Sequence, residues 1–171
     1  MLIQKNDNYK LISFPDNSSQ IGQIIRQTLN DGQMSALSLQ LLFSSDRLNQ
    51  AEHINELKKE HTVIVTRYSY SAIAYGTARG LNKQLMSLLE ENMPQPDLKI
   101  FLQIPVNISI NRAKNPDFLE RDRALLKKVV KEYEFILSDE KDWHIIDATK
   151  SITSVFDQVQ EIIWNYIQNK Q

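Results

Sequence analysis

Four short apolar runs, separated by longer segments of helical periodicity, constrain the fold of this chain more than any other feature. The runs are residues 9–14, 62–66, 97–104 and 143–148. Short apolar strands that alternate with helices are typical of a parallel sheet with both faces covered. The sequence therefore predicts a single α/β domain over residues 1–171, and this length suffices to bury a core.

The segments between and after the apolar runs predict five helices. Apolar residues that recur every three or four positions mark the buried faces, and glycine or proline marks the ends. The predicted helices are residues 21–29 with Gly32 as the stop, a helix from Ser35 to Leu57, residues 81–92 before Pro94 and Pro96, residues 119–137 and residues 152–167.

Composition excludes several functions. Twenty Lys and Arg residues against 21 Asp and Glu residues leave a net charge of −1, and no basic stretch interleaves with aromatic residues, so no nucleic acid partner is expected. The chain has no cysteine, and its three histidines lack the spacing of metal ligands, so no metal site is expected. The first ten residues carry no targeting signal and no apolar run is long enough to span a membrane. We therefore expect a soluble, intracellular protein without membrane insertion, in a compartment that the sequence leaves open.

Ligands bind outside the carboxyl ends of the strands in an open parallel sheet. In this chain those ends are residues 14–17, 66–71 and 147–149. Arg67 is well placed there to meet a phosphate or carboxylate, and Arg47 could join it from the second helix. In the alternative interpretation, Arg67 only pairs with a local acid such as Asp46.

Three aromatic residues accompany these arginines. Phe43, Tyr68 and Tyr75 could stack on a planar ligand. Aromatic residues at helical spacing also occur as ordinary core residues, and the pattern alone leaves both interpretations open.

Five segments, in this order, resemble landmarks of thymidylate kinases of the eukaryotic and poxviral type: "FPDNSSQIG", "LLFSSDR", "TRYSYSAIAYGTARG", "PQPDLKIFL" and "IIDAT". The resemblance implies a P-loop nucleoside-monophosphate kinase fold, a place in pyrimidine nucleotide metabolism and a pocket for thymidine monophosphate. In that pocket Phe43 would stack on the base and Tyr75 would flank it, while Arg47 and Arg67 would hold the phosphate or the base edge. The same pocket would also include Phe14, Tyr68 and Ser71.

The sequence departs from the family at the ATP side. A kinase of this kind needs the loop G-x-x-x-x-G-K-[ST] to hold ATP and magnesium. None of the four glycines is followed by lysine, and only about a dozen residues precede Phe14, whereas a βαβ unit needs about 30. We therefore expect the first strand, the glycine loop and most of the first helix to be missing, so that ATP and Mg²⁺ would bind only if such a segment exists.

Two substitutions affect phosphoryl transfer directly. Asn17 stands where the family has an arginine, and Thr66 stands where it has an aspartate. A neutral amide cannot neutralise transition-state charge, and a hydroxyl offers no formal charge to a divalent cation. These changes favour an inactive, thymidylate-kinase-like pseudoenzyme that binds a nucleotide or serves as a structural subunit of a larger assembly. The alternative is an amino-terminally truncated kinase that phosphorylates thymidine monophosphate with ATP to the diphosphate.

The role of three further arginines stays open. Arg112, Arg121 and Arg123 could act as lid cations, or they could lie on a solvated helix face with Glu120 and Asp122 as partners.

Partners follow from the resemblance. It implies a homodimer through the region 35–60, where an apolar stripe would serve a dimer or pack on the sheet; the stripe comprises Leu37, Leu41 and Leu48. Loss of a central strand would also leave backbone groups unpaired unless the gap closes or another chain fills it, and a partner segment is the more economical solution.

Overall fold

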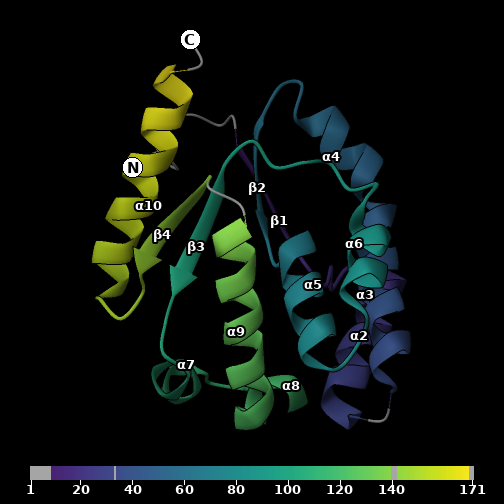
Figure 1. Ribbon diagram of the computed structural model, residues 1–171. Helices are drawn as coiled ribbons and strands as arrows, with labels where there is room; N and C mark the ends of the chain where they lie inside the picture. Colours follow the sequence, from purple (N-terminus) through teal and green to yellow (C-terminus); the bar gives the residue numbers. More distant parts are fainter. Residues whose placement is uncertain (1–8, 33, 140–141, 170–171) are drawn as a thin grey trace.

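The computed structural model describes residues 9–32, 34–139 and 142–169 (Figure 1). The prediction that the first ten residues carry no targeting signal concerns residues 1–8 in particular, which lie outside the described residues.

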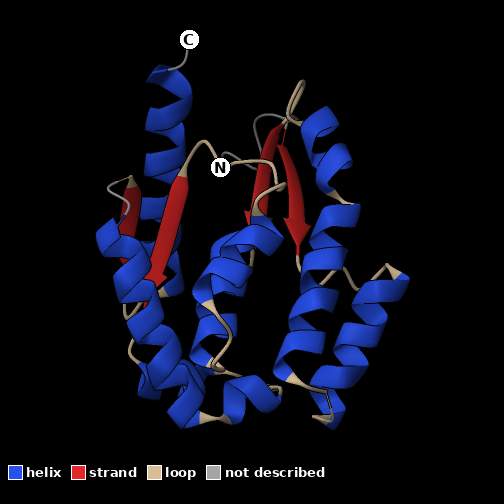
Figure 2. Cartoon of the chain, turned by 45° about the vertical axis from the view of Figure 1, so that its right-hand side comes forward, coloured by secondary structure: helices blue, strands red, loops and turns tan. Residues whose placement is uncertain are grey.

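All four predicted strands are confirmed. They are β1 (Tyr9–Ser13), β2 (Thr62–Thr66), β3 (Lys99–Gln103) and β4 (Trp143–Asp147). β1 pairs in parallel with β2, and β3 pairs in parallel with β4. The described strands form two separate pairs instead of one continuous sheet, as Figure 2 shows from a second direction.

The two strand pairs are less buried than a covered parallel sheet would be. Parallel strands ordinarily lie between helical layers and are buried on both faces. Here Leu11 is 67% exposed, Leu102 is 48% exposed and Ile145 is 52% exposed. Apolar surface of both strand pairs is therefore open to solvent in this chain.

The helices are more numerous than predicted. They are α2 (Gln20–Asp31), α3 (Ala36–Asn49), α4 (Ala51–Leu57), α5 (Ser69–Ala78), α6 (Lys83–Glu90), α7 (Val106–Arg112), α8 (Phe118–Arg121), α9 (Arg123–Asp139) and α10 (Ile152–Asn169). The sequence pattern predicts neither α5 nor α7. α5 buries Ala72, Ala74 and Ala78 and is apolar on most of its surface, so the amphipathic period that marks a helix in a sequence is weak.

Two of the predicted helices are divided in the structure. The predicted helix from Ser35 to Leu57 is interrupted at Gln50, whose side-chain Nε2 donates a hydrogen bond to Asp16 at 3.1 Å. The predicted helix over 119–137 is interrupted at Asp122, which has an extended backbone. Its Oδ1 accepts hydrogen bonds from the backbone N–H groups of Ala124 and Leu125, so it caps a new helix.

Local signals located other helix ends correctly. Gly32 ends α2 in the left-handed region at φ 68°, which costs glycine little, and donates its N–H to the carbonyl of Thr28. The hydroxyl of Ser35 caps α3 by accepting a hydrogen bond from the N–H of Ser38. Both predictions are confirmed because each depends only on residues within one turn.

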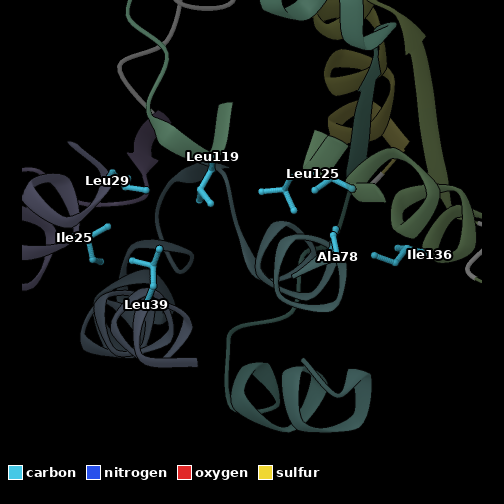
Figure 3. Close-up of a cluster of buried hydrophobic side chains, with 9 residues drawn as sticks. Ile25, Leu29, Leu39, Ala78, Leu119, Leu125 and Ile136 are labelled. Atoms are coloured by element: carbon cyan, nitrogen blue, oxygen red, sulfur yellow. The ribbon is translucent and has the colours of Figure 1, made fainter. Parts of the chain in front are cut away.

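The main hydrophobic core lies among helices. Its buried members come from α2, α3, α5, α8 and α9, and Figure 3 shows the side chains of this cluster among the helices; they are Ile25, Leu29, Leu39, Ala74, Ala78, Leu119, Leu125, Val129 and Ile136. By contrast, Leu37, Leu41 and Leu48 on α3 are 41–45% exposed. The idea that this stripe packs on the sheet is therefore wrong, and the homodimer stays a prediction.

Aromatic contacts connect the two halves of the molecule. Tyr70 of α5 meets Trp143 of β4 edge-on, with ring centroids 4.9 Å apart. Phe101 of β3 lies at the same centroid distance from Tyr133 of α9. Because α5 follows β2 directly and packs along α9, these contacts hold the second strand pair to the first without strand pairing.

Candidate functional site

Arg67 stands at the carboxyl end of β2 in an unusual backbone conformation. Its φ is 61°, in the left-handed region that residues other than glycine rarely adopt, at a cost of order 1–3 kcal/mol. Its Nη2 donates to Oε1 of Glu120 at 2.6 Å, and the two side chains are 49% and 30% exposed. The predicted anion-binding arginine is thus reachable from solvent and is already paired with a carboxylate.

A polar group surrounds Arg67. Arg67 acts to lower the pKa of Tyr75 on α5, and the side chain of Ser71 acts to lower that of Tyr133 on α9, so these side chains lie close together. Burial raises the pKa of Tyr75 and of Tyr133, which keeps both phenols neutral. Burial also works to lower the pKa of Arg67, but the electrostatic interactions with the Tyr75 side chain and the Glu120 carboxylate outweigh it, and the net shift is upward. The structure therefore brings together three predicted site residues, Arg67, Ser71 and Tyr75.

Arg47 lies in a different environment. Arg47 is 2% exposed. It donates two hydrogen bonds to Glu90 at the end of α6, from Nε to Oε2 at 2.9 Å and from Nη2 to Oε1 at 2.6 Å. The hydroxyl of Ser44 adds a third bond to Glu90 at 2.7 Å. Arg47 thus forms a buried ion pair, and its predicted contact with a ligand stays a prediction.

Tyr68 lies near this ion pair, and Phe14 packs on Tyr68. Their rings stack with centroids 6.1 Å apart, and Phe14 is buried. Among the described residues the Tyr68 hydroxyl is buried without a hydrogen-bond partner. The pKa of Tyr68 is raised to about 12, mainly by burial and also by the negative charge of Glu90, while the positive charge of Arg47 opposes the shift. Phe43, which was predicted to stack on a base, packs against the helical core.

The loop before α2 is tied to Asp46. This carboxylate is 1% exposed and accepts hydrogen bonds from the N–H of Asp16 at 2.8 Å and from the hydroxyl of Ser19 at 2.8 Å. The alternative that Arg67 pairs with Asp46 is therefore wrong, because Asp46 is occupied by this loop while Arg67 pairs with Glu120.

The two substituted positions lie on the surface. Asn17 accepts a hydrogen bond from Nε of Arg26 at 3.2 Å, and Thr66 is exposed at the end of β2. Neither supplies the carboxylate that magnesium prefers. Within residues 9–32, 34–139 and 142–169, no cluster of His, Cys, Asp and Glu could hold a metal. Whether ATP and Mg²⁺ bind through a further segment stays a prediction.

The structure gives new partners to two of the three arginines that were predicted as possible lid cations. Arg112 donates to the carbonyls of Ala148 and Thr149 at 2.6 and 2.8 Å, and Arg121 donates to the carbonyl of Pro116 at 2.7 Å. The interpretation that Glu120 and Asp122 pair with them is wrong, because Glu120 is bound to Arg67 and Asp122 caps α9. Arg123 begins α9 and is exposed. A lid function stays a prediction.

The sequence pattern does not predict two acidic residues that the structure places at the candidate site. Glu120 and Glu90 lie 53 and 43 residues from the arginines that they bind. The one local signal at Glu120 was the Asp117-x-x-Glu120 pattern of a capping box, which the structure confirms. That pattern indicates where α8 begins and carries no information about Arg67.

Fold and site together define a class of protein. Parallel strands flanked by helices, with an arginine at the carboxyl end of a strand, place the chain among nucleoside-monophosphate-kinase-like α/β proteins. The sequence model of thymidylate kinase matches residues 1–159. The chain belongs to the thymidylate kinase family.

Individual relatives agree with this assignment. A thymidylate kinase of Dictyostelium discoideum is 35% identical over 155 residues, covering 90% of this chain and 69% of the relative. One of Prochlorococcus marinus is 34% identical, covering 95% and 83%. The solved structure of thymidylate kinase from Candida albicans superposes with a TM-score of 0.78 at 30% identity, over 92% of this chain and 80% of that one. In the described part of the chain, no helix is long and apolar enough to traverse a lipid bilayer.

Proposed function

We propose that this chain binds a nucleoside monophosphate of the thymidine type and that these 171 residues on their own do not transfer a phosphoryl group. The observation that carries the proposal is the half-exposed Arg67, which is held beside Tyr75 and Ser71 and already pairs with an anionic group. A guanidinium in this position suits a phosphate, which offers it several acceptor oxygens.

The lack of phosphoryl transfer follows from charges that are absent near this site. Asn17 and Thr66 carry none, and the sequence contains no G-x-x-x-x-G-K-[ST] loop. Phosphoryl transfer depends almost entirely on positioning and on electrostatic stabilisation of the transferring group. Binding needs only Arg67 and its neighbours, so it can persist where catalysis does not.

Thymidine monophosphate should raise the melting temperature of the wild-type chain, and Arg67→Ala should abolish the rise. Differential scanning fluorimetry at millimolar ligand measures the shift, and a coupled assay with ATP and Mg²⁺ should detect no diphosphate. Arg26→Ala is the matched control, because it removes an exposed arginine of α2 whose Nε donates a hydrogen bond to Asn17. A wild-type chain that shows no shift would refute the binding site.

The alternative is an active thymidylate kinase of which this sequence is a part. It predicts an in-frame glycine loop encoded upstream of Met1. A longer protein containing that loop would then convert thymidine monophosphate to the diphosphate. Turnover by the longer protein would refute the pseudoenzyme proposal for the natural product.

A structural role in a larger assembly is a second candidate, and the separation of the two strand pairs favours it. β2 and β3 do not pair with each other in the described residues. Their free backbone groups suit an added parallel strand, since unpaired edges template pairing. Exposed apolar side chains on helix α10 also favour a partner, because Ile152 is 88% exposed and Trp164 is 51% exposed.

Native mass spectrometry of the protein purified from its own source tests the structural role. We expect a complex in which this chain accompanies other subunits, and a chain that is poorly soluble when expressed alone. A freely soluble, stable monomer of 19.9 kDa would contradict a subunit role.

A further inference from the structure

The carboxylate that faces Arg67 comes from a separate segment of the chain. Glu120 belongs to α8, a helix of only four residues that lies between α2 and α9 (Figure 1). Its Oε1 accepts the 2.6 Å hydrogen bond from Arg67, while its Oε2 faces the N–H of Asp117 at 3.4 Å in the capping box. One carboxylate therefore serves both the helix start and the arginine.

A carboxylate and a phosphate compete for the same face of a guanidinium. Both present anionic oxygens to its N–H donors, and both form short, charge-assisted hydrogen bonds. Glu120 is bound at the Nη2 of Arg67, and among the described residues no other acid forms an ion pair with this arginine. A phosphate that takes the N–H now bound to Glu120 must first displace this carboxylate.

We propose that Glu120 is a tethered competitor for the anion site at Arg67, released when the phosphate of a nucleotide takes its place. The inference rests on the proposed nucleotide binding and adds a residue that weakens it. Partial exposure makes the exchange feasible, because water can solvate the released carboxylate at little cost. A thymidine without phosphate gains nothing from Arg67 and leaves the pair intact.

The Glu120→Gln variant tests this role with little disturbance of the fold. Glutamine keeps the length of the side chain and can still close the capping box. Asp122→Asn is the matched control, because it removes one nearby negative charge and asparagine can still cap α9. Isothermal titration calorimetry would measure the Kd of thymidine monophosphate and of thymidine for both variants and the wild type.

We expect Glu120→Gln to bind thymidine monophosphate about two- to fivefold more tightly than the wild type, the range of an exposed ion pair. Its affinity for thymidine, and both affinities of Asp122→Asn, should stay unchanged. Equal gains in the two variants would mean a general charge effect, and a weaker Glu120→Gln would mean that Glu120 orients Arg67; either overturns the inference.

The binding results distinguish failure of the inference from failure of the proposed function. If the wild type and Glu120→Gln bind the nucleotide equally well, nucleotide binding stands and the competitor role falls. If neither protein binds it, the proposed site itself is refuted, and the role of Glu120 falls with it.

Discussion

The Glu90→Ala variant should lose about 3–5 kcal/mol of its free energy of unfolding, the usual effect of removing one partner of a buried ion pair. Arg47 is 2% exposed, and both of its bonded nitrogens point at Glu90. Without that carboxylate, the guanidinium would stay buried and uncompensated, and the hydroxyl of Ser44 would lose its acceptor. Urea denaturation monitored by circular dichroism measures the loss.

Two further variants separate the ion pair from simple loss of side-chain volume. Replacing both partners, as in Arg47→Met with Glu90→Leu, should recover much of the lost stability because no charge stays buried. Lys59→Ala removes one partner of a pair with Glu56 whose side chains are 67% and 68% exposed, and it should change stability little. A Glu90→Ala loss no larger than that of Lys59→Ala would contradict the role of the buried pair.

The Gly22→Ala variant should be destabilised by about 3 kcal/mol, because overpacking and broken hydrogen bonds add. A Cβ at this position would lie 1.8 Å from the carbonyl oxygen of Asp16. The clash is with backbone, so no side-chain rotation relieves it. The loop that would have to move is the one that Asp46 holds through Asp16 and Ser19.

Gln20→Ala provides the comparison for this substitution. Gln20 is exposed in the first turn of the same helix, where a surface change to alanine typically alters stability by less than about 0.5 kcal/mol. Thermal and urea unfolding of the two variants should therefore differ clearly. A Gly22→Ala protein as stable as the wild type would show that the loop does not approach the helix this closely.

Substantial parts of the fold were predictable because their causes are local. An apolar run of five residues such as Thr62–Thr66 carries its own strand signal. Gly32 and Ser35 act on backbone groups within one turn. Helix α5 was missed because its buried alanines give it no polar face. The break at Gln50 was missed because it involves Asp16, 34 residues away.

The candidate site was predictable in part for the same reason. Arg67, Ser71 and Tyr75 lie within nine positions of one another, so a strand followed by a helix brings them together. Their polar neighbours on α8 and α9, Glu120 and Tyr133, come from far along the chain. No pattern around either residue indicates which partner the fold will give it.

By itself, the sequence determined the strands, several helix ends, the family and the arginine at the end of β2, since each depends on residue types within a short window. Tertiary structure alone decided that Arg47 is buried on Glu90, that Arg67 faces Glu120 and that the four strands form two pairs. Ion pairs and strand pairing depend on distances in space between residues that are remote in sequence. The helix and strand propensities of a short segment do not determine those distances.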